Sequence, residues 1–107
     1  MARERVLGEF EHLVLLAVLR HPAGVIGSHI GRELEARAGR RVSRGALYSA
    51  LDRLEAKGCL RWTVEAGVPE RGGHPPRRFV VTRTGRAALR VYHRAVNNLL
   101  AGVAGRF

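Results

Sequence analysis

One stretch in the middle of the chain decides the fold: residues 42–58 read VSRGALYSALDRLEAKG. Its apolar residues recur at i, i+4 and i+7, which is the spacing of one face of an α-helix. They are Leu47, Leu51 and Leu54. Ser43 precedes the pattern as an N-cap residue, and Gly58 follows it where helices commonly end in a left-handed conformation. The stretch therefore predicts a helix with one buried face.

The opposite face of this helix carries small and polar side chains. At 100° per residue it consists of Gly45, Ser49, Asp52 and Ala56, with Tyr48 and Arg53 on the two flanks. Such a face lets the helix backbone approach base edges in a DNA major groove, which is ~12 Å wide. Arg44 stands on the first turn, where anions are favoured. Asp52 would repel phosphates, although it could accept a hydrogen bond from a cytosine amine.

Two more helices are expected before this one. Residues 7–20 are apolar on more than one face, which predicts a helix buried on several sides. A second helix is predicted to begin at Gly27 or Ser28, with Ser28 as its N-cap, and to end at Gly39. Only a few residues then separate the second helix from the third, which is the spacing of a helix-turn-helix.

After Gly58 the pattern changes to alternation. Residues 59–65 alternate apolar and polar side chains, which predicts a half-buried strand with Trp62 in the core. Residues 77–82 predict a second strand, and the turn-rich residues 67–76 join the two into a hairpin, or wing. Residues 84–103 predict a final helix with an apolar seam at heptad-like spacing. The seam consists of Gly85, Leu89, Tyr92, Val96, Leu99 and Val103.

This order of elements predicts a mainly α fold with a small β-hairpin, of the α+β class. We expect a winged helix-turn-helix DNA-binding domain over residues 1–83 and a C-terminal dimerisation helix over residues 84–107. The third helix and the wing would both face a nucleic acid. The chain is short for an independent domain, so a second copy would supply additional core.

The charge of the chain is concentrated in the same region. The 107 residues hold 19 Lys and Arg against 9 Asp and Glu, for a formal net charge of +10. Residues 36–94 contain fourteen basic and four acidic residues, so they alone account for an excess of ten. A localised excess, here almost entirely arginine, is typical of a surface that binds a polyanion.

Several classes of protein are excluded or disfavoured by the sequence. The single cysteine, Cys59, cannot form an intramolecular disulfide, which fits a reducing cytosol. The longest apolar run, residues 13–19, is far shorter than the ~20 residues of a membrane span, and the N-terminus lacks a secretory pattern. We therefore expect a cytoplasmic protein with no membrane partner. The histidines are scattered, and no catalytic arrangement is evident, so we expect no enzyme, metal or cofactor.

Residues 42–58 also resemble the recognition-helix pattern of the PadR family of transcriptional regulators, V-S-x-G-x-L-Y-x-x-L-x-R-L-E-x-x-G. The similarity extends to about residues 7–92. It includes Leu7-Gly8-Glu9, Glu70-Arg71-Gly72-Gly73, Arg77-Arg78-Phe79 and Thr82-Arg83-Thr84-Gly85. One departure is Ile26, where the family usually has a tyrosine before the glycine that opens the second helix. The chain length matches the small subgroup with a single C-terminal helix.

The resemblance implies a homodimeric transcriptional repressor that binds double-stranded DNA. It also implies that the last helix of each subunit packs on the partner's first helix. Two-fold symmetry would then require a pseudo-palindromic operator. The resemblance further implies that Tyr48 and the wing arginines contact phosphates. The candidate DNA-binding residues are Ser43, Arg44, Gly45, Tyr48, Ser49, Arg53, Arg71, His74, Arg77 and Arg78. The candidate dimerisation residues are Leu13, Leu16, Leu89, Tyr92, Val96, Leu99, Leu100 and Val103.

Other interpretations stay open at the level of the sequence. Tyr48 could pack at the edge of the core, and Arg71, Arg77 and Arg78 could be ordinary solvated surface, one of them paired with Glu70. A small-molecule effector of unknown identity is compatible with the family. The main alternative function is a basic RNA-binding or ribosome-associated module. Against it, most of the few aromatic residues are assigned to packing, whereas single-strand binders need a stacking platform.

Overall fold

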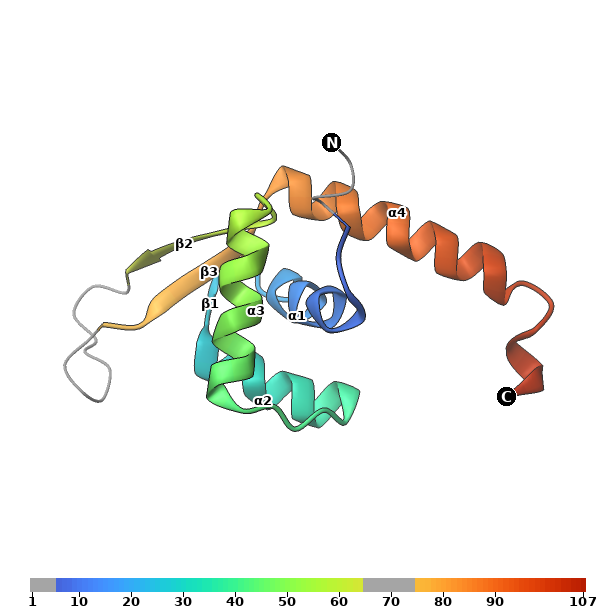
Figure 1. Ribbon diagram of the computed structural model, residues 1–107, viewed down its shortest axis with the longest axis horizontal. Helices are drawn as coiled ribbons and strands as arrows, with labels where there is room; N and C mark the ends of the chain where they lie inside the picture. Colours follow the sequence, from blue (N-terminus) through green and yellow to red (C-terminus); the bar gives the residue numbers. More distant parts are fainter. Residues whose placement is uncertain (1–5, 65–74) are drawn as a thin grey trace.

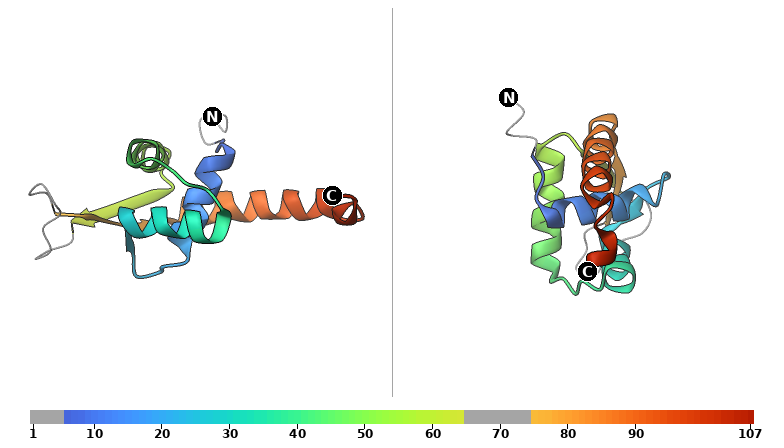
Figure 2. Two further views of the ribbon diagram at one scale, coloured as in Figure 1. Left: turned by 90° about the horizontal axis from the view of Figure 1, so that it is seen from below. Right: turned by 90° about the vertical axis from the view of Figure 1, so that its right-hand side faces the viewer.

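The computed structural model describes residues 6–64 and 75–107. Three helices form the centre of the molecule, and a small sheet and a long fourth helix leave this centre in opposite directions (Figures 1 and 2). In chain order the elements are α1 (Glu9–Leu19), β1 (Val25–Ile26), α2 (Gly27–Ala38), α3 (Arg44–Ala56), β2 (Leu60–Val64), β3 (Arg77–Val81), α4 (Arg83–Leu100) and the short 3-10 helix η2 (Ala104–Arg106). The predicted helices and the two predicted strands are confirmed.

Helix α1 lies at the centre of the core, as its apolar surface on several faces predicts. It contacts α2, α3, β3 and α4. Its residues Val14, Leu15 and Val18 are fully buried. The predicted stripe of α3 is buried against it, together with Ala50 between its leucines. Burial of these aliphatic side chains is the main favourable contribution to the fold.

Among the described residues the sheet has three strands, one more than expected. The order is β1-β3-β2, so β3 is the central strand. β2 pairs antiparallel with β3 in the register Trp62↔Phe79, and β1 pairs antiparallel with β3 in the register Val25↔Phe79. Because β1 has only two residues, it shows no alternation by which a sequence pattern could find it. It forms because it supplies hydrogen bonds to the free edge of β3.

The ends of the helices follow the predicted capping residues, with one exception. The Ser43 hydroxyl oxygen accepts a hydrogen bond from the backbone N–H of Ala46 at 3.1 Å, and Gly58 has φ +78° after the end of α3. The prediction of Ser28 as the N-cap of α2 is wrong. The chain runs directly from β1 into α2, so the extended Ile26 is the N-cap, and the helix begins at Gly27.

Helix α4 projects away from the core (Figure 1). Within α4, the structure buries Gly85 and Leu89, both in its first half. The helix ends at Leu100, three residues before the predicted end, because Gly102 takes a left-handed conformation at φ +81°. Over residues 6–64 and 75–107, none of the helices combines the length and the apolar character needed to cross a bilayer.

Candidate nucleic-acid interface

Helix α3 presents the predicted outward face to solvent. Its residues Gly45, Ser49, Asp52 and Ala56 are exposed, opposite the buried leucines. Ser43 and Arg44, at the start of the helix, are exposed as well. A Cβ built on Gly45 would meet no heavy atom within 4 Å among the described residues, so this end of the face is open. The geometry therefore allows the backbone of α3 to approach another molecule closely.

Tyr48 packs at the edge of the core and joins α3 to α2. It is half-buried, and its hydroxyl group lies against Gly27, where a Cβ would overlap the phenol ring. The Arg44 guanidinium lies 5.0 Å from the centroid of the Tyr48 ring, within the range of a cation–π contact. The start of α2, the Tyr48 hydroxyl and the Arg44 side chain are thereby brought together.

The N-terminus of α2 is capped by Ile26, an apolar residue. Ile26 has no side-chain acceptor for the first backbone N–H groups of the helix, and α2 has no acidic residue in its first turn. Ser28 and His29, which follow, are exposed. An N-terminus of this kind is a favourable place for an anion because its N–H groups and the helix dipole both attract negative charge.

Arg77 lies under α3 rather than in the solvent around the wing. Side chains alternate along β3, so Arg77 shares the inner face of the strand with Phe79 and Val81. Its guanidinium lies 5.4, 5.0 and 5.3 Å from the ring centroids of Tyr48, Trp62 and Phe79. Its Nη1 lies 3.4 Å from Asp52 Oδ1 on α3. The residue expected to contact phosphates thus connects the base of the wing to α3.

Arg78 points from the other face of β3. Its Nη1 donates a hydrogen bond to the Gly24 carbonyl oxygen at 2.8 Å. Gly24 has φ +105°, and a Cβ there would lie 2.5 Å from the Arg78 Cγ, so only glycine fits both the backbone and the packing. The contact attaches the turn before β1 to the sheet.

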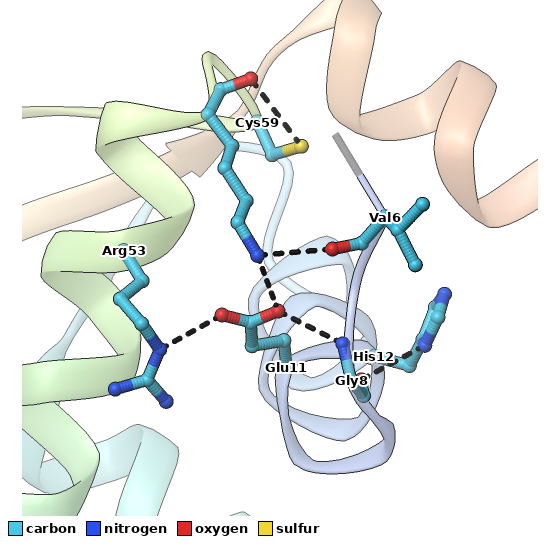
Figure 3. A network of polar contacts seen from close by, with 7 residues as sticks. Val6, Gly8, Glu11, His12, Arg53 and Cys59 are labelled. Atoms are coloured by element: carbon cyan, nitrogen blue, oxygen red, sulfur yellow. Dashed lines mark hydrogen bonds and ion pairs between the residues drawn. The ribbon is translucent and has the colours of Figure 1, made fainter. Parts of the chain in front are cut away.

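Arg53 is engaged in a polar network at the flank of α3 (Figure 3). Its Nε donates to Glu11 Oε2 at 2.9 Å, and Lys57 Nζ donates to Glu11 Oε1 at 2.9 Å. The Gly8 N–H donates to the same Oε1 at 2.9 Å. Burial works to raise the pKa of Glu11, but Lys57, the Gly8 N–H and Arg53 outweigh it and hold the pKa below its ordinary value. Glu11 is therefore ionised and links α1 to the end of α3.

Two of the predicted DNA-binding residues, Arg71 and His74, lie outside the described residues. The predicted dimerisation residues divide into two groups. Leu89 is buried within its own chain, and Leu13 is half-buried against the core. Leu16, Tyr92, Leu99 and Val103 are exposed large apolar residues, whereas Val96 and Leu100 are half-buried.

An apolar groove of about 710 Å³ separates the start of α1 from α4. His12, Tyr92 and Ala95 are among its lining residues. The His12 and Tyr92 rings are stacked, with centroids 3.7 Å apart and an angle of 17° between the planes. Burial lowers the pKa of His12, so that its neutral form is favoured in this environment.

The sequence alone does not reveal that Glu11 is the partner of Arg53, or that Asp52 and Trp62 are partners of Arg77. For Arg77 a signal was present. The alternation that places Phe79 and Val81 in the core also places Arg77 on the same side. For Glu11 no local pattern exists, since Arg53 is 42 positions away.

A three-helix core with an exposed third helix beside a β-wing is a winged helix-turn-helix, a fold of DNA-binding proteins. Residues 15–91 match the family described as the transcriptional regulator PadR-like family. Transcriptional regulator Rv3488 of Mycobacterium tuberculosis is 42% identical over 94 residues, which cover 86% of this chain and 83% of that protein. The chain belongs to the PadR-like family.

Solved structures share the fold of this chain. A PadR-like transcription factor from Bacteroides fragilis has a TM-score of 0.75 at 23% identity, covering 98% of this chain and 93% of that one. Streptococcus pneumoniae FabT in complex with DNA has a TM-score of 0.64 at 19% identity, covering 94% of this chain and 62% of that one. At these identities the two structures show the shared fold. The chain is a DNA-binding transcriptional regulator, and its family consists of regulators rather than enzymes.

Proposed function

We propose that the chain is a homodimeric repressor that acts in the cytoplasm and binds a pseudo-palindromic operator. In this proposal α3 enters the major groove, where Ser43, Gly45 and Ser49 approach bases. The observation that carries it is the small, exposed face of α3 directly beside the cluster of Arg44, Tyr48 and the start of α2. A base-reading surface and a phosphate-binding surface therefore adjoin each other, as sequence-specific binding requires.

The phosphate site is assigned to the N-terminus of α2 together with Arg44 and Tyr48. The Ile26 cap provides no side-chain acceptor for the first N–H groups of α2. The Tyr48 hydroxyl lies against Gly27 at the same end of the helix. A DNA phosphate seated here would accept hydrogen bonds from N–H groups, a hydroxyl and a guanidinium, which would fix the register of α3 on the duplex.

The wing would contact the flanking backbone, and we assign this role to Arg71 and His74. Arg53 and Arg78 each have a hydrogen-bond partner in their own chain, so we propose that they place α3 and the sheet correctly rather than supply the main phosphate contacts. The resemblance to the family implied that the wing arginines contact phosphates; in this proposal Arg78 instead has a structural role.

The dimer interface is assigned to α4 and α1. Leu99 is 79% exposed on the projecting half of α4, and Leu16 is exposed on α1. Exposed large apolar side chains are favourable positions for an interaction with another molecule. We propose that the seam of Tyr92, Val96 and Leu99 on α4, together with Val103 just beyond the end of the helix, packs against the partner's α1 and α4. Two-fold symmetry then separates the half-sites by ~10 base pairs or a multiple.

Selection of bound duplexes from a random pool, followed by footprinting upstream of the chain's own gene, tests this proposal. We expect a two-fold symmetric site. With about 6–10 phosphate contacts, affinity for that site should fall ~10³–10⁵-fold between 50 and 200 mM salt. The RNA-binding alternative makes the opposite prediction. If single-stranded RNA displaces the selected duplex at equal concentration, the proposed function is wrong.

A further inference from the structure

Asp52 is an acidic residue on a surface that must approach a polyanion. It lies on the exposed face of α3, and 62% of its side chain is exposed. A carboxylate at this place repels phosphates and only accepts hydrogen bonds. It therefore weakens binding wherever α3 meets only the DNA backbone. Towards DNA, it is favourable where a hydrogen-bond donor is available on a base edge.

The Asp52 carboxylate is oriented by Arg77 from the wing. The Arg77 Nη1 lies 3.4 Å from the Asp52 Oδ1, and 27% of the Arg77 side chain is exposed. An ion pair of this length with an exposed partner adds little to stability, so stability alone does not account for the arrangement. The main effect of this ion pair is geometric, because the pair connects a residue of the wing to the exposed face of α3.

Arg77 is itself held in place by three aromatic rings. Tyr48 belongs to α3, whereas Trp62 and Phe79 belong to the wing strands β2 and β3. The rings therefore come from both sides of the contact between α3 and the wing. Their centroids lie 5.0–5.4 Å from the guanidinium carbon. Contacts of a planar guanidinium with aromatic faces are directional, and a lysine would not reproduce them. The position of Arg77, and with it that of Asp52, is therefore coupled to the packing of the wing on α3.

We propose that Asp52 determines specificity by accepting a hydrogen bond from the exocyclic amino group of a cytosine in the major groove, and that Arg77 is the positioning residue for its carboxylate. The inference rests on the proposed function, since it requires α3 in the major groove. Cytosine presents the N4 amino donor there, and aspartate is a suitable acceptor for it. Where α3 lies in another register on the duplex, repulsion between Asp52 and the DNA phosphates adds to the discrimination against incorrect sites.

The test uses the full-length protein and a site selected by the unmodified chain. At each position of one half-site, all four base pairs are compared for the unmodified protein, Asp52→Asn, Arg77→Met, Arg77→Lys and the double variant Asp52→Asn/Arg77→Met. Asparagine keeps one acceptor oxygen but loses the charge and gains a donor, so we expect Asp52→Asn to reduce a cytosine preference of about 5–150-fold at one position and to tighten binding to an unrelated duplex. Arg77→Met should weaken the base preference at the same position. In the double variant, it should cause no further loss of preference beyond that of Asp52→Asn. Arg77→Lys should restore the preference only in part.

Two measurements separate positioning from simple unfolding. Trp62 is the single tryptophan of the chain, so its fluorescence reports on the packing around Arg77. We expect a change in Arg77→Met but not in Asp52→Asn, whose side chain is mostly exposed. Thermal unfolding of each variant shows whether the fold is retained, and Arg77→Lys provides the milder substitution if Arg77→Met does not fold.

Three results would overturn the inference while the proposed function stands. Asp52→Asn could retain every base preference, or the preference it removes could be for adenine. Arg77→Met could instead leave base preference intact and reduce the salt slope by about one on every duplex, which would identify Arg77 as a phosphate contact. If the unmodified protein selects no duplex at all, the proposed function fails together with this inference.

Discussion

Glu11 of α1 and Arg53 of α3 form a hydrogen-bonded ion pair, with 2.9 Å between Glu11 Oε2 and Arg53 Nε, although 42 positions separate them in the sequence. The Glu11 side chain is only 5% exposed. Lys57, the C-cap residue of α3, donates a hydrogen bond to the other carboxylate oxygen. A single buried carboxylate therefore connects the helix proposed to face the partner subunit with the helix proposed to read DNA.

Glu11→Ala should destabilise the fold. The substitution leaves Arg53, Lys57 and the Gly8 N–H without their shared acceptor. We expect the free energy of unfolding to fall by about 2–3 kcal/mol, somewhat below the loss for a fully buried pair, because Arg53 can still reach water. Denaturant unfolding measures the change. Glu9→Ala is the matched control, since Glu9 pairs with Arg40 at the surface, and it should have little effect. Equal losses in the two variants would show that Glu11 has no special structural role.

Acidification should destabilise the protein in the range where His12 titrates. Burial lowers the pKa of His12; the Gly8 carbonyl and Glu11 oppose this effect, and Lys57 adds to it. The folded state therefore binds this proton less readily than the unfolded state, whose histidine pKa is about 6.5. The resulting stability is present above pH ~6.5 and is lost as the pH falls through the lower folded pKa.

The measurement is denaturant unfolding between pH ~7 and ~5. His12→Phe keeps a ring against Tyr92 without a titratable group, so the pH dependence in this window should flatten. Glu11 has a pKa below the ordinary carboxyl value, so its titration contributes only at more acidic pH. An unchanged pH profile in His12→Phe would contradict the assignment.

Leu99→Glu should produce monomers. Leu99 is 79% exposed, so a charge there does not disturb the chain's own packing. In the proposed dimer the same charge would be buried in an apolar seam, which is strongly unfavourable. Sedimentation measures the oligomeric state. Asn98→Glu introduces the same charge at the adjacent, exposed position outside the seam and should leave the dimer intact. A dimeric Leu99→Glu protein would show that α4 is not the interface.

Arg44→Gln should weaken binding to all duplexes by a similar factor. Arg44 lies on the first turn of α3 against Tyr48, where we place a DNA phosphate. Loss of one phosphate contact should reduce the slope of log affinity against log salt by about one. Arg94→Gln makes the same charge change on the projecting half of α4 and should preserve the slope. If Arg44→Gln instead alters the preference for one base pair, Arg44 reads sequence rather than binding the backbone.

The sequence by itself determined the four α-helices, the strands β2 and β3 and their order. The stripe of α3, its Ser43 cap and the left-handed Gly58 lie close together in the chain, and each acts through local geometry. The alternation of Leu60 and Trp62 similarly identified β2. The same local spacing over residues 42–58 indicated the PadR family, because the family's pattern fixes which residues of α3 face inward. The exposed face of α3 could therefore be predicted in full.

The tertiary structure alone decided what the charged side chains do. The alternation of β3 indicated only the inward side for Arg77, and nothing local distinguished Arg53 or Arg78 from other basic residues. Each has a partner far away in the chain: Asp52 for Arg77, Glu11 for Arg53 and the Gly24 carbonyl oxygen for Arg78. The two-residue β1 likewise exists only because β3 offers an unpaired edge. The physical reason is the same in each case. A charged group or a strand edge acquires its role from the groups that folding places beside it, and these lie 25 to 54 positions away in the chain.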